Sequence, residues 1–124
     1  MTLKMYGLDR SAHELVAEFC PKGVLNKTHD MRTTATFGLE RFFGEYLRLK
    51  DKESEYWKET WDEFVKIMNS VGITVPTLTT GTQANSTTIR QVIDDLWNED
   101  KFPKATRKIA LAVLIQLCDN MVLS

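Results

Sequence analysis

The most reactive side chains in this chain are two histidines and two cysteines: His13, His29, Cys20 and Cys118. His13 and Cys20 are seven residues apart, so in a helix they could share a face, and a Cys–His pair can form an activated nucleophile. The simpler interpretation places His13 in solvent on a first helical turn and packs Cys20 before a proline. Cys118 lies within an apolar segment and is expected to behave as a small hydrophobic side chain. We therefore predict no catalytic residues and no enzyme activity.

The same side chains do not predict a metal site either. Such a site needs three or four clustered ligands, and two histidines and two cysteines scattered along the chain do not supply them. Glu59 and Glu63 are four residues apart, as in a paired-acid site, but Lys58 and Lys66 lie on either side of them, which favours ion pairs on a solvated helix face. Gly81 stands alone among threonines, so there is no glycine-rich phosphate loop. We expect no cofactor and no metal.

The basic residues predict a different kind of site, one that holds the phosphate backbone of a nucleic acid. The candidates are Lys101, Lys104, Arg107, Lys108, Arg32, Arg41 and Arg48. The first four lie at or before the start of the last predicted helix, where free amides and lysines can bind phosphate. Two alternatives stay open at this point. Glu45 can pair with Arg41 or Arg48, and the first four cations can pair with nearby acids, which are Asp94, Asp95, Glu99 and Asp100.

Composition predicts a single globular domain over residues 1–124. Hydrophobic residues make up 43% of the chain and charged residues 27%, as in ordinary soluble proteins. The formal net charge is -1, so a nucleic acid would have to be held by a local patch. Two cysteines without a metal or redox spacing indicate a reducing compartment, and the first ten residues lack the apolar stretch of a signal peptide. We expect a cytoplasmic protein.

Hydrophobic periodicity predicts an all-α fold, a bundle of about five helices. The expected helices cover approximately residues 11–20, 28–50, 54–71, 86–98 and 103–123. The expected caps are Ser11 with Glu14 for the first helix, Thr28 or Asp30 for the second, and Ser86 or Thr87 for the fourth. The second helix is predicted to continue through Gly38 and Gly44, although each costs about 1 kcal/mol against alanine in a helix; close approach of a neighbouring helix is one reason considered for them. Val71 and Trp97 are predicted on the inner faces of their helices, and Gly72 is predicted to end the third.

The uncharged segment 73–86 is expected to be a long loop, with a short strand at 73–75 as an alternative. The helix after it, the last in the chain, is apolar nearly all round from Ile109 to Cys118. A surface helix normally keeps one polar face, so this helix must be covered on most sides by its own domain or by another molecule. Its apolar stretch is roughly half the length of a membrane span. After Lys108 it offers few polar side chains to read base edges, so sequence-specific DNA recognition is not expected.

In size, predicted helical class and local basic residues, the chain resembles the small subunits of CRISPR effector complexes. Its closing stretch, RKIALAVLIQL at 107–117, is similar to the carboxyl end of large-subunit-derived segments of that family. The resemblance implies a non-enzymatic bundle that packs on other protein subunits, copies of itself among the candidates. It also implies contact with the backbone of guide RNA or of a target or displaced strand. The mild negative charge departs from that pattern. The alternative function is a protein-binding inhibitor, immunity or adaptor protein without nucleic-acid contact.

Overall fold

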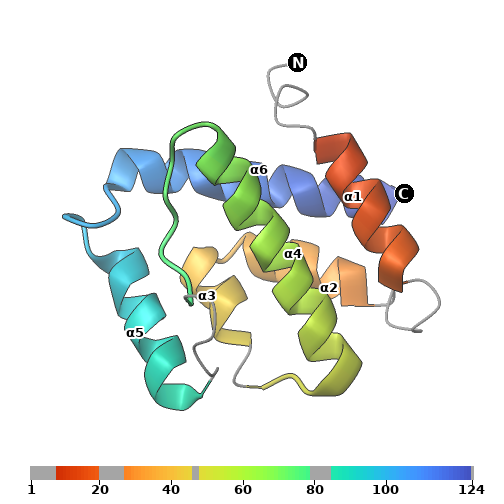
Figure 1. The fold of residues 1–124 in the computed structure, drawn as a ribbon, viewed down its shortest axis with the longest axis horizontal. Helices are drawn as coiled ribbons and strands as arrows, with labels where there is room; N and C mark the ends of the chain where they lie inside the picture. Colours follow the sequence, from red (N-terminus) through yellow and green to blue (C-terminus); the bar gives the residue numbers. More distant parts are fainter. Residues whose placement is uncertain (1–7, 20–26, 46–47, 79–84, 124) are drawn as a thin grey trace.

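The protein is all helical in its computed structural model, which describes residues 8–19, 27–45, 48–78 and 85–123 (Figure 1). The helices in these ranges are α1 (Leu8–Phe19), α2 (Thr28–Ala35), α3 (Leu39–Gly44), α4 (Asp51–Ser70), α5 (Ser86–Trp97) and α6 (Lys104–Leu123). The all-α class is therefore confirmed. The short strand considered at 73–75 does not form, and residues 79–84 of the predicted loop lie outside the described ranges.

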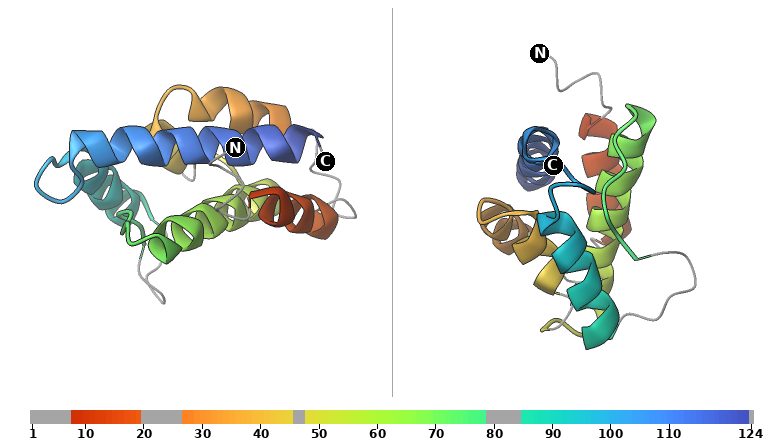
Figure 2. Two further views of the ribbon diagram at one scale, coloured as in Figure 1. Left: turned by 90° about the horizontal axis from the view of Figure 1, so that it is seen from above. Right: turned by 90° about the vertical axis from the view of Figure 1, so that its left-hand side faces the viewer.

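Helix α6 is the axis of the molecule. Helices α1 and α2 pack on two of its sides, and α4 also contacts it (Figures 1 and 2). Helix α3 packs against α5 at the end of the molecule where α6 begins. The core between these helices is rich in aromatic side chains, and its largest fully buried members include Trp57, Trp61, Tyr56, Phe42 and Phe64. Burial of each stabilises the fold by roughly 1.5–3 kcal/mol.

The helix predicted over residues 28–50 is broken at Gly38, so the prediction of one continuous helix was wrong. Gly38 has a φ of 124°, which residues with a Cβ rarely adopt. The apolar spacing continues across this break, because Met31 in α2 and Leu39 in α3 are both buried. A pattern of apolar positions could therefore not reveal the change of direction.

Gly44 lies next to α5, but the approach of that helix does not require a glycine. A Cβ added at this position would lie 3.6 Å from Cδ1 of Ile93 on α5, which is ordinary van der Waals contact. Helix α3 ends here, and α4 then begins at Asp51, three residues before the predicted Ser54. The indole nitrogen of Trp57 donates to the backbone oxygen of Phe42 at 2.8 Å, which ties α4 to α3.

The predicted caps of the first two helices were wrong. Helix α1 begins before Ser11, whose hydroxyl instead donates to Glu63 Oε2 at 2.7 Å and links α1 to α4. At the start of α2 neither Thr28 nor Asp30 caps the helix; the cap position is Lys27, which makes no capping hydrogen bond with its side chain.

At α5 the capping residue is Asn85, one position before the predicted Ser86. Asn85 Oδ1 accepts from the Thr88 amide and Thr88 Oγ1 accepts from the Asn85 amide, each at 3.0 Å. These reciprocal bonds form a capping box.

The end of α4 was predicted correctly, but the predicted place of Val71 on the inner face of this helix was wrong, because Val71 is 46% exposed. Gly72 has a φ of 85°, and the amides of Gly72 and Ile73 donate back to Asn69 and Met68 at 3.1 and 3.0 Å. This is the Schellman arrangement that glycine favours. After it, residues 73–78 lie against α4, because Val75 is buried and Thr77 Oγ1 accepts a 2.9 Å hydrogen bond from the Trp61 indole.

Helix α6 is buried on the sides that contact α1, α2 and α4, as its apolar sequence predicted. Ala110, Leu114 and Leu117 are fully buried, whereas Ala105 and Ala112 on the opposite side are exposed. None of the helices in the described ranges has the length and apolar character needed to span a bilayer.

Candidate functional site

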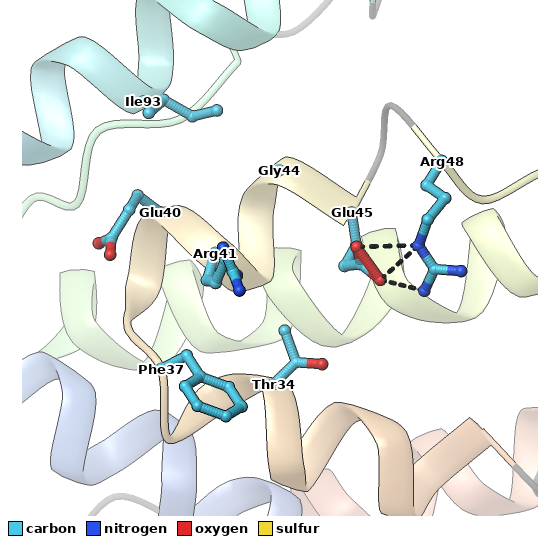
Figure 3. A pocket seen from close by; sticks show the side chains of 8 residues that line it. All are labelled: Thr34, Phe37, Glu40, Arg41, Gly44, Glu45, Arg48 and Ile93. Atoms are coloured by element: carbon cyan, nitrogen blue, oxygen red, sulfur yellow. Dashed lines mark hydrogen bonds and ion pairs between the residues drawn. The ribbon is translucent and has the colours of Figure 1, made fainter.

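An open pocket lies between α3 and α5 and brings two of the predicted basic residues together (Figure 3). Its volume is about 600 Å³, and it is lined by Thr34, Phe37, Glu40, Arg41, Gly44, Glu45, Arg48 and Ile93. Cavities of this size hold small ligands. The lining combines the apolar side chains of Phe37 and Ile93 with charged side chains, so the ligand or contact that it suits carries both an apolar surface and charge.

The two arginines of the pocket have different environments. The Nε of Arg48 donates to both carboxylate oxygens of Glu45, at 3.1 and 3.2 Å. This hydrogen bonding raises the pKa of Arg48 above its usual value. Pairing with Glu45, one of the alternatives that the sequence left open, is therefore confirmed for Arg48. Arg41 instead lies over the ring of Phe37, with its guanidinium carbon 5.8 Å from the ring centroid, and has no carboxylate partner among the described residues.

Phe37 is the most exposed large apolar side chain in the described part of the chain, with 63% of its surface accessible. It lies in the short connection between α2 and α3, where the backbone amide of Phe37 donates to Thr34 at 3.0 Å. The turn thus holds an aromatic ring in solvent at the edge of the pocket, beneath the guanidinium of Arg41.

A second arginine–aromatic pair lies where α5 ends and α6 begins. The guanidinium carbon of Arg107 is 4.8 Å from the ring centroid of Trp97, which is cation–π range. Trp97 is 56% exposed, so its predicted place on the inner face of the helix was wrong. Ile93, which lines the pocket, precedes Trp97 by one turn of α5. The second pair is thus about 6 Å further along that helix.

The basic residues at the start of α6 have three different environments. Lys101 pairs with Asp95, with Nζ and Oδ1 3.1 Å apart. Lys104 and Lys108 are exposed and form no ion pair with any described residue. Arg107 is half-buried, and its Nε is buried without a hydrogen-bond partner within the described ranges. Lys104 and Lys108 are therefore the cations most available to an anionic partner.

The acids at the end of α5 neutralise this basic group only in part. Asp95 is the member that pairs with a lysine. Asp94, Glu99 and Asp100 are exposed, and none of them pairs with a described cation. Local charge compensation, the second alternative that the sequence left open, is therefore limited to Asp95 and Lys101.

Arg32 lies apart from the other candidates. Its Nε pairs with the carboxylate of Asp119 on α6, and both side chains are partly exposed. The pair joins α2 to α6 across 87 positions of sequence. Arg32 is therefore already bonded within the fold, and we exclude it from the candidate site.

His13 and His29 are exposed on different helices. Cys20 lies outside the described residues, so the alternative in which it pairs with His13 stays a prediction. Cys118 is buried, and burial raises the pKa of its thiol to about 12. Within the described ranges no group of histidine, cysteine and acidic side chains is placed to hold a metal ion.

Phe37 with Arg41 and Trp97 with Arg107 form two pairs in which an arginine lies over an exposed aromatic ring. Exposed aromatic rings of this kind can stack on nucleic-acid bases, and arginine adds cation–π attraction and a contact for phosphate. The arginines were predicted from their charge. The rings were not, since apolar spacing assigned Trp97 to the core and gave no role to Phe37. No protein-family model, curated protein or solved structure matches this chain.

Proposed function

We propose that the protein is a non-enzymatic helical subunit of a ribonucleoprotein assembly, and that it contacts single-stranded nucleic acid without reading its sequence. The observation that carries this proposal is the pair of exposed rings, Phe37 and Trp97, each beneath an arginine. Proteins that bind single strands combine aromatic platforms with cations that follow the phosphates. The assembly that we favour is a cytoplasmic CRISPR effector complex, in which the chain would also pack on neighbouring subunits.

The arrangement of the charges supports contact with phosphates at two places. Arg41 faces the open pocket without a carboxylate partner, and Lys104 and Lys108 extend from the start of α6. The amides at the start of that helix add a favourable field for anions. Because Arg41 lies beside Phe37 and the two lysines lie on the same helix as Arg107, the partner of Trp97, a strand that stacks on both rings would have phosphate contacts near each ring.

Fluorescence anisotropy with labelled single-stranded RNA and DNA of mixed sequence tests this function. Stacking on an aromatic side chain contributes about 1–3 kcal/mol per base, so we expect Phe37→Ala and Trp97→Ala each to weaken binding by roughly tenfold. Both side chains are exposed, and circular dichroism should show an unchanged helical fold. Changing the base sequence of the oligonucleotide should change the affinity little.

Val71→Ala is the matched control, because Val71 is also an exposed apolar residue, 46% accessible, but lies at the end of α4. This variant should bind as tightly as the original protein. If the original protein does not bind either oligonucleotide at low salt, or if the two aromatic substitutions have no effect, the proposal is wrong.

A second function is favoured by the unpaired acids next to Trp97. Asp94, Glu99 and Asp100 would repel a phosphate backbone, whereas arginine, tryptophan and phenylalanine are enriched in protein–protein interfaces. In this alternative the same surface binds a protein partner, as in an inhibitor, immunity or adaptor protein. The native mass of the complex purified from its own cells distinguishes the two, because nuclease and moderate salt would leave a protein-only complex intact.

A further inference from the structure

The pocket between α3 and α5 is lined by equal numbers of acidic and basic side chains. The charged members of its lining are Glu40, Arg41, Glu45 and Arg48. Glu45 and Arg48 satisfy each other through hydrogen bonds at 3.1 and 3.2 Å. Glu40 and Arg41 have no ion-pair partner among the described residues. The pocket therefore offers a ligand one free carboxylate, which accepts hydrogen bonds, and one free guanidinium, which donates them.

The surroundings of the pocket add no excess of cations. On α5, Arg90 precedes the pocket residue Ile93 by one turn and Asp94 follows it directly, and both charged side chains are exposed. On the other side, Asp30 and Glu53 share a single cation, Lys27, with 3.6 Å between the atoms of each ion pair. A site for phosphate alone would need more cations than acids, so the pocket suits a ligand that brings both acceptors and a donor.

Glu40 and Arg41 converge on the exposed ring of Phe37. A Cβ built on Gly38, the residue after Phe37, would lie 3.0 Å from the carboxylate carbon of Glu40. The missing side chain of Gly38 thus leaves the space beside the ring that this carboxylate occupies. The guanidinium carbon of Arg41 lies 5.8 Å from the centroid of the same ring, and Figure 3 shows the three side chains at one end of the pocket. A ligand that stacks against Phe37 therefore meets both a free anion and a free cation.

RNA and DNA differ in what they offer to the carboxylate of Glu40. The sugar–phosphate backbone of DNA contains only hydrogen-bond acceptors, whereas each ribose of RNA carries a 2′-hydroxyl that can donate. Acidic side chains hold ribose hydroxyls in this way in dinucleotide-binding proteins. A DNA strand against Phe37 would leave Glu40 facing acceptors, whereas an RNA strand would supply the donor that this carboxylate lacks.

We propose that the pocket binds one ribonucleotide of a single strand and thereby favours RNA over DNA. The base stacks against Phe37, a phosphate contacts Arg41, and the ribose 2′-hydroxyl donates to Glu40. None of these contacts depends on which base is present, so the preference concerns the sugar and not the sequence. This assignment rests on the proposed function and adds to it the kind of nucleic acid that is bound.

Fluorescence anisotropy with three oligonucleotides of one sequence, built from adenine and cytosine only, tests the role of the sugar. The three are RNA, DNA, and RNA in which fluorine replaces each 2′-hydroxyl, which keeps the sugar pucker of RNA but removes the donor. A hydrogen bond to a charged group changes affinity by about tenfold or more, so RNA should bind about tenfold more tightly than the other two. Equal binding of RNA and its fluorinated analogue would overturn the inference, and the proposed function would still stand if that binding depended on Phe37. Failure of all three to bind would overturn both.

Substitution of Glu40 tests whether this residue reads the sugar. The readout is the ratio of RNA affinity to DNA affinity, because the loss of an acid strengthens the binding of both strands. Glu40→Leu should lower this ratio from about tenfold to near one, and Glu40→Gln, which keeps a neutral acceptor, should give an intermediate ratio. Glu55→Leu removes an exposed acid on α4, outside the pocket, and as the matched control it should leave the ratio unchanged. A ratio that is the same in Glu40→Leu as in the original protein would overturn the inference.

Discussion

Cys118 and Tyr56 show how burial changes the chemistry of single residues in this core. Both side chains are fully buried, and desolvation raises the pKa of each. The phenol of Tyr56 is hydrogen-bonded to the hydroxyl of Thr28 at 2.6 Å, which partly offsets the effect of burial on its pKa. The thiol stays protonated at neutral pH, as expected for a cysteine that acts as a hydrophobic side chain.

The raised pKa of Cys118 predicts that the fold loses stability in alkaline solution. An unfolded thiol ionises near 9.0, whereas the buried one ionises at about 12. Between these values the folded state holds a proton that the unfolded chain has released, so the free energy of unfolding falls as pH rises. Well above pH 9 this single group contributes a slope of about 1.4 kcal/mol per pH unit, and well below pH 9 it contributes none.

Urea unfolding between pH 7 and pH 11 measures this effect, with Cys118→Ala as the comparison. The variant should be less stable at neutral pH because it leaves a small cavity, but its stability should decline less steeply above pH 9. Tyr56 remains in both proteins, and its raised pKa acts in the same direction in each. If the stability of the two proteins depended on pH in the same way, the raised pKa of Cys118 would be contradicted.

At the residue scale, the sequence predicted the basic members of the site but not their partners. Glu45 and Arg48 are three residues apart, so their pairing was among the alternatives. The contact between Arg32 and Asp119 depends on how α2 packs against α6, which local spacing does not contain. Trp97 follows the apolar period of α5 and was therefore assigned to the core, although it is the last residue of its helix and extends past the packed surface.

At the element scale, Gly38 separates α2 from α3 through its backbone conformation. A side chain at this φ is strained, and an added Cβ would also collide with the carboxylate of Glu40. We therefore expect Gly38→Ala to lower the free energy of unfolding by about 1–3 kcal/mol, as measured by urea denaturation. It should also displace Phe37 and weaken any binding that depends on this ring.

The other two described glycines provide graded controls for that substitution. Gly72 has a φ of 85° but open space around it, so Gly72→Ala should cost about 1 kcal/mol. Gly44 lies at the end of a helix with room for a Cβ, so Gly44→Ala should be neutral or slightly stabilising. If all three substitutions have equal effects, the backbone argument for Gly38 is wrong.

Helix positions were predictable where an apolar period coincided with a local stop signal. Helix α4 ends at Gly72 as expected, because a glycine stands directly after the last turn. Gly38 is also a glycine, and so a helix stop signal, but the apolar positions on either side of it continue with helical spacing. Which glycine redirects the chain depends on its backbone conformation in the fold, because Gly38 has a positive φ and Gly44 does not.

At the scale of the whole molecule, a net charge of -1 leaves nucleic-acid binding dependent on where the cations lie. Lys104→Glu combined with Lys108→Glu removes the two unpaired lysines at the start of α6. If these lysines contact phosphates of a single strand, the slope of log affinity against log salt should decrease by about 1.4, which is 0.7 per lost contact. Arg107 is not substituted, because the loss of its packing against Trp97 would change the binding surface as well as the charge.

The control for this charge change is Lys52→Glu combined with Lys66→Glu. Both lysines are exposed on α4, and the double variant has the same net charge as the first. It should keep the salt slope of the original protein. Equal losses in the two variants would show that overall charge, and not the start of α6, controls the interaction.

The distribution of the three tryptophans provides an intrinsic optical probe of the proposed surface. Trp57 and Trp61 are enclosed in the core, whereas Trp97 is open to solvent beneath a guanidinium. A small aqueous quencher such as iodide should therefore reach one indole and not the other two. Any ligand that covers Trp97 would shield its emission from the quencher, so occupancy could be followed on the unlabelled protein, with Trp97→Phe as the silent reference.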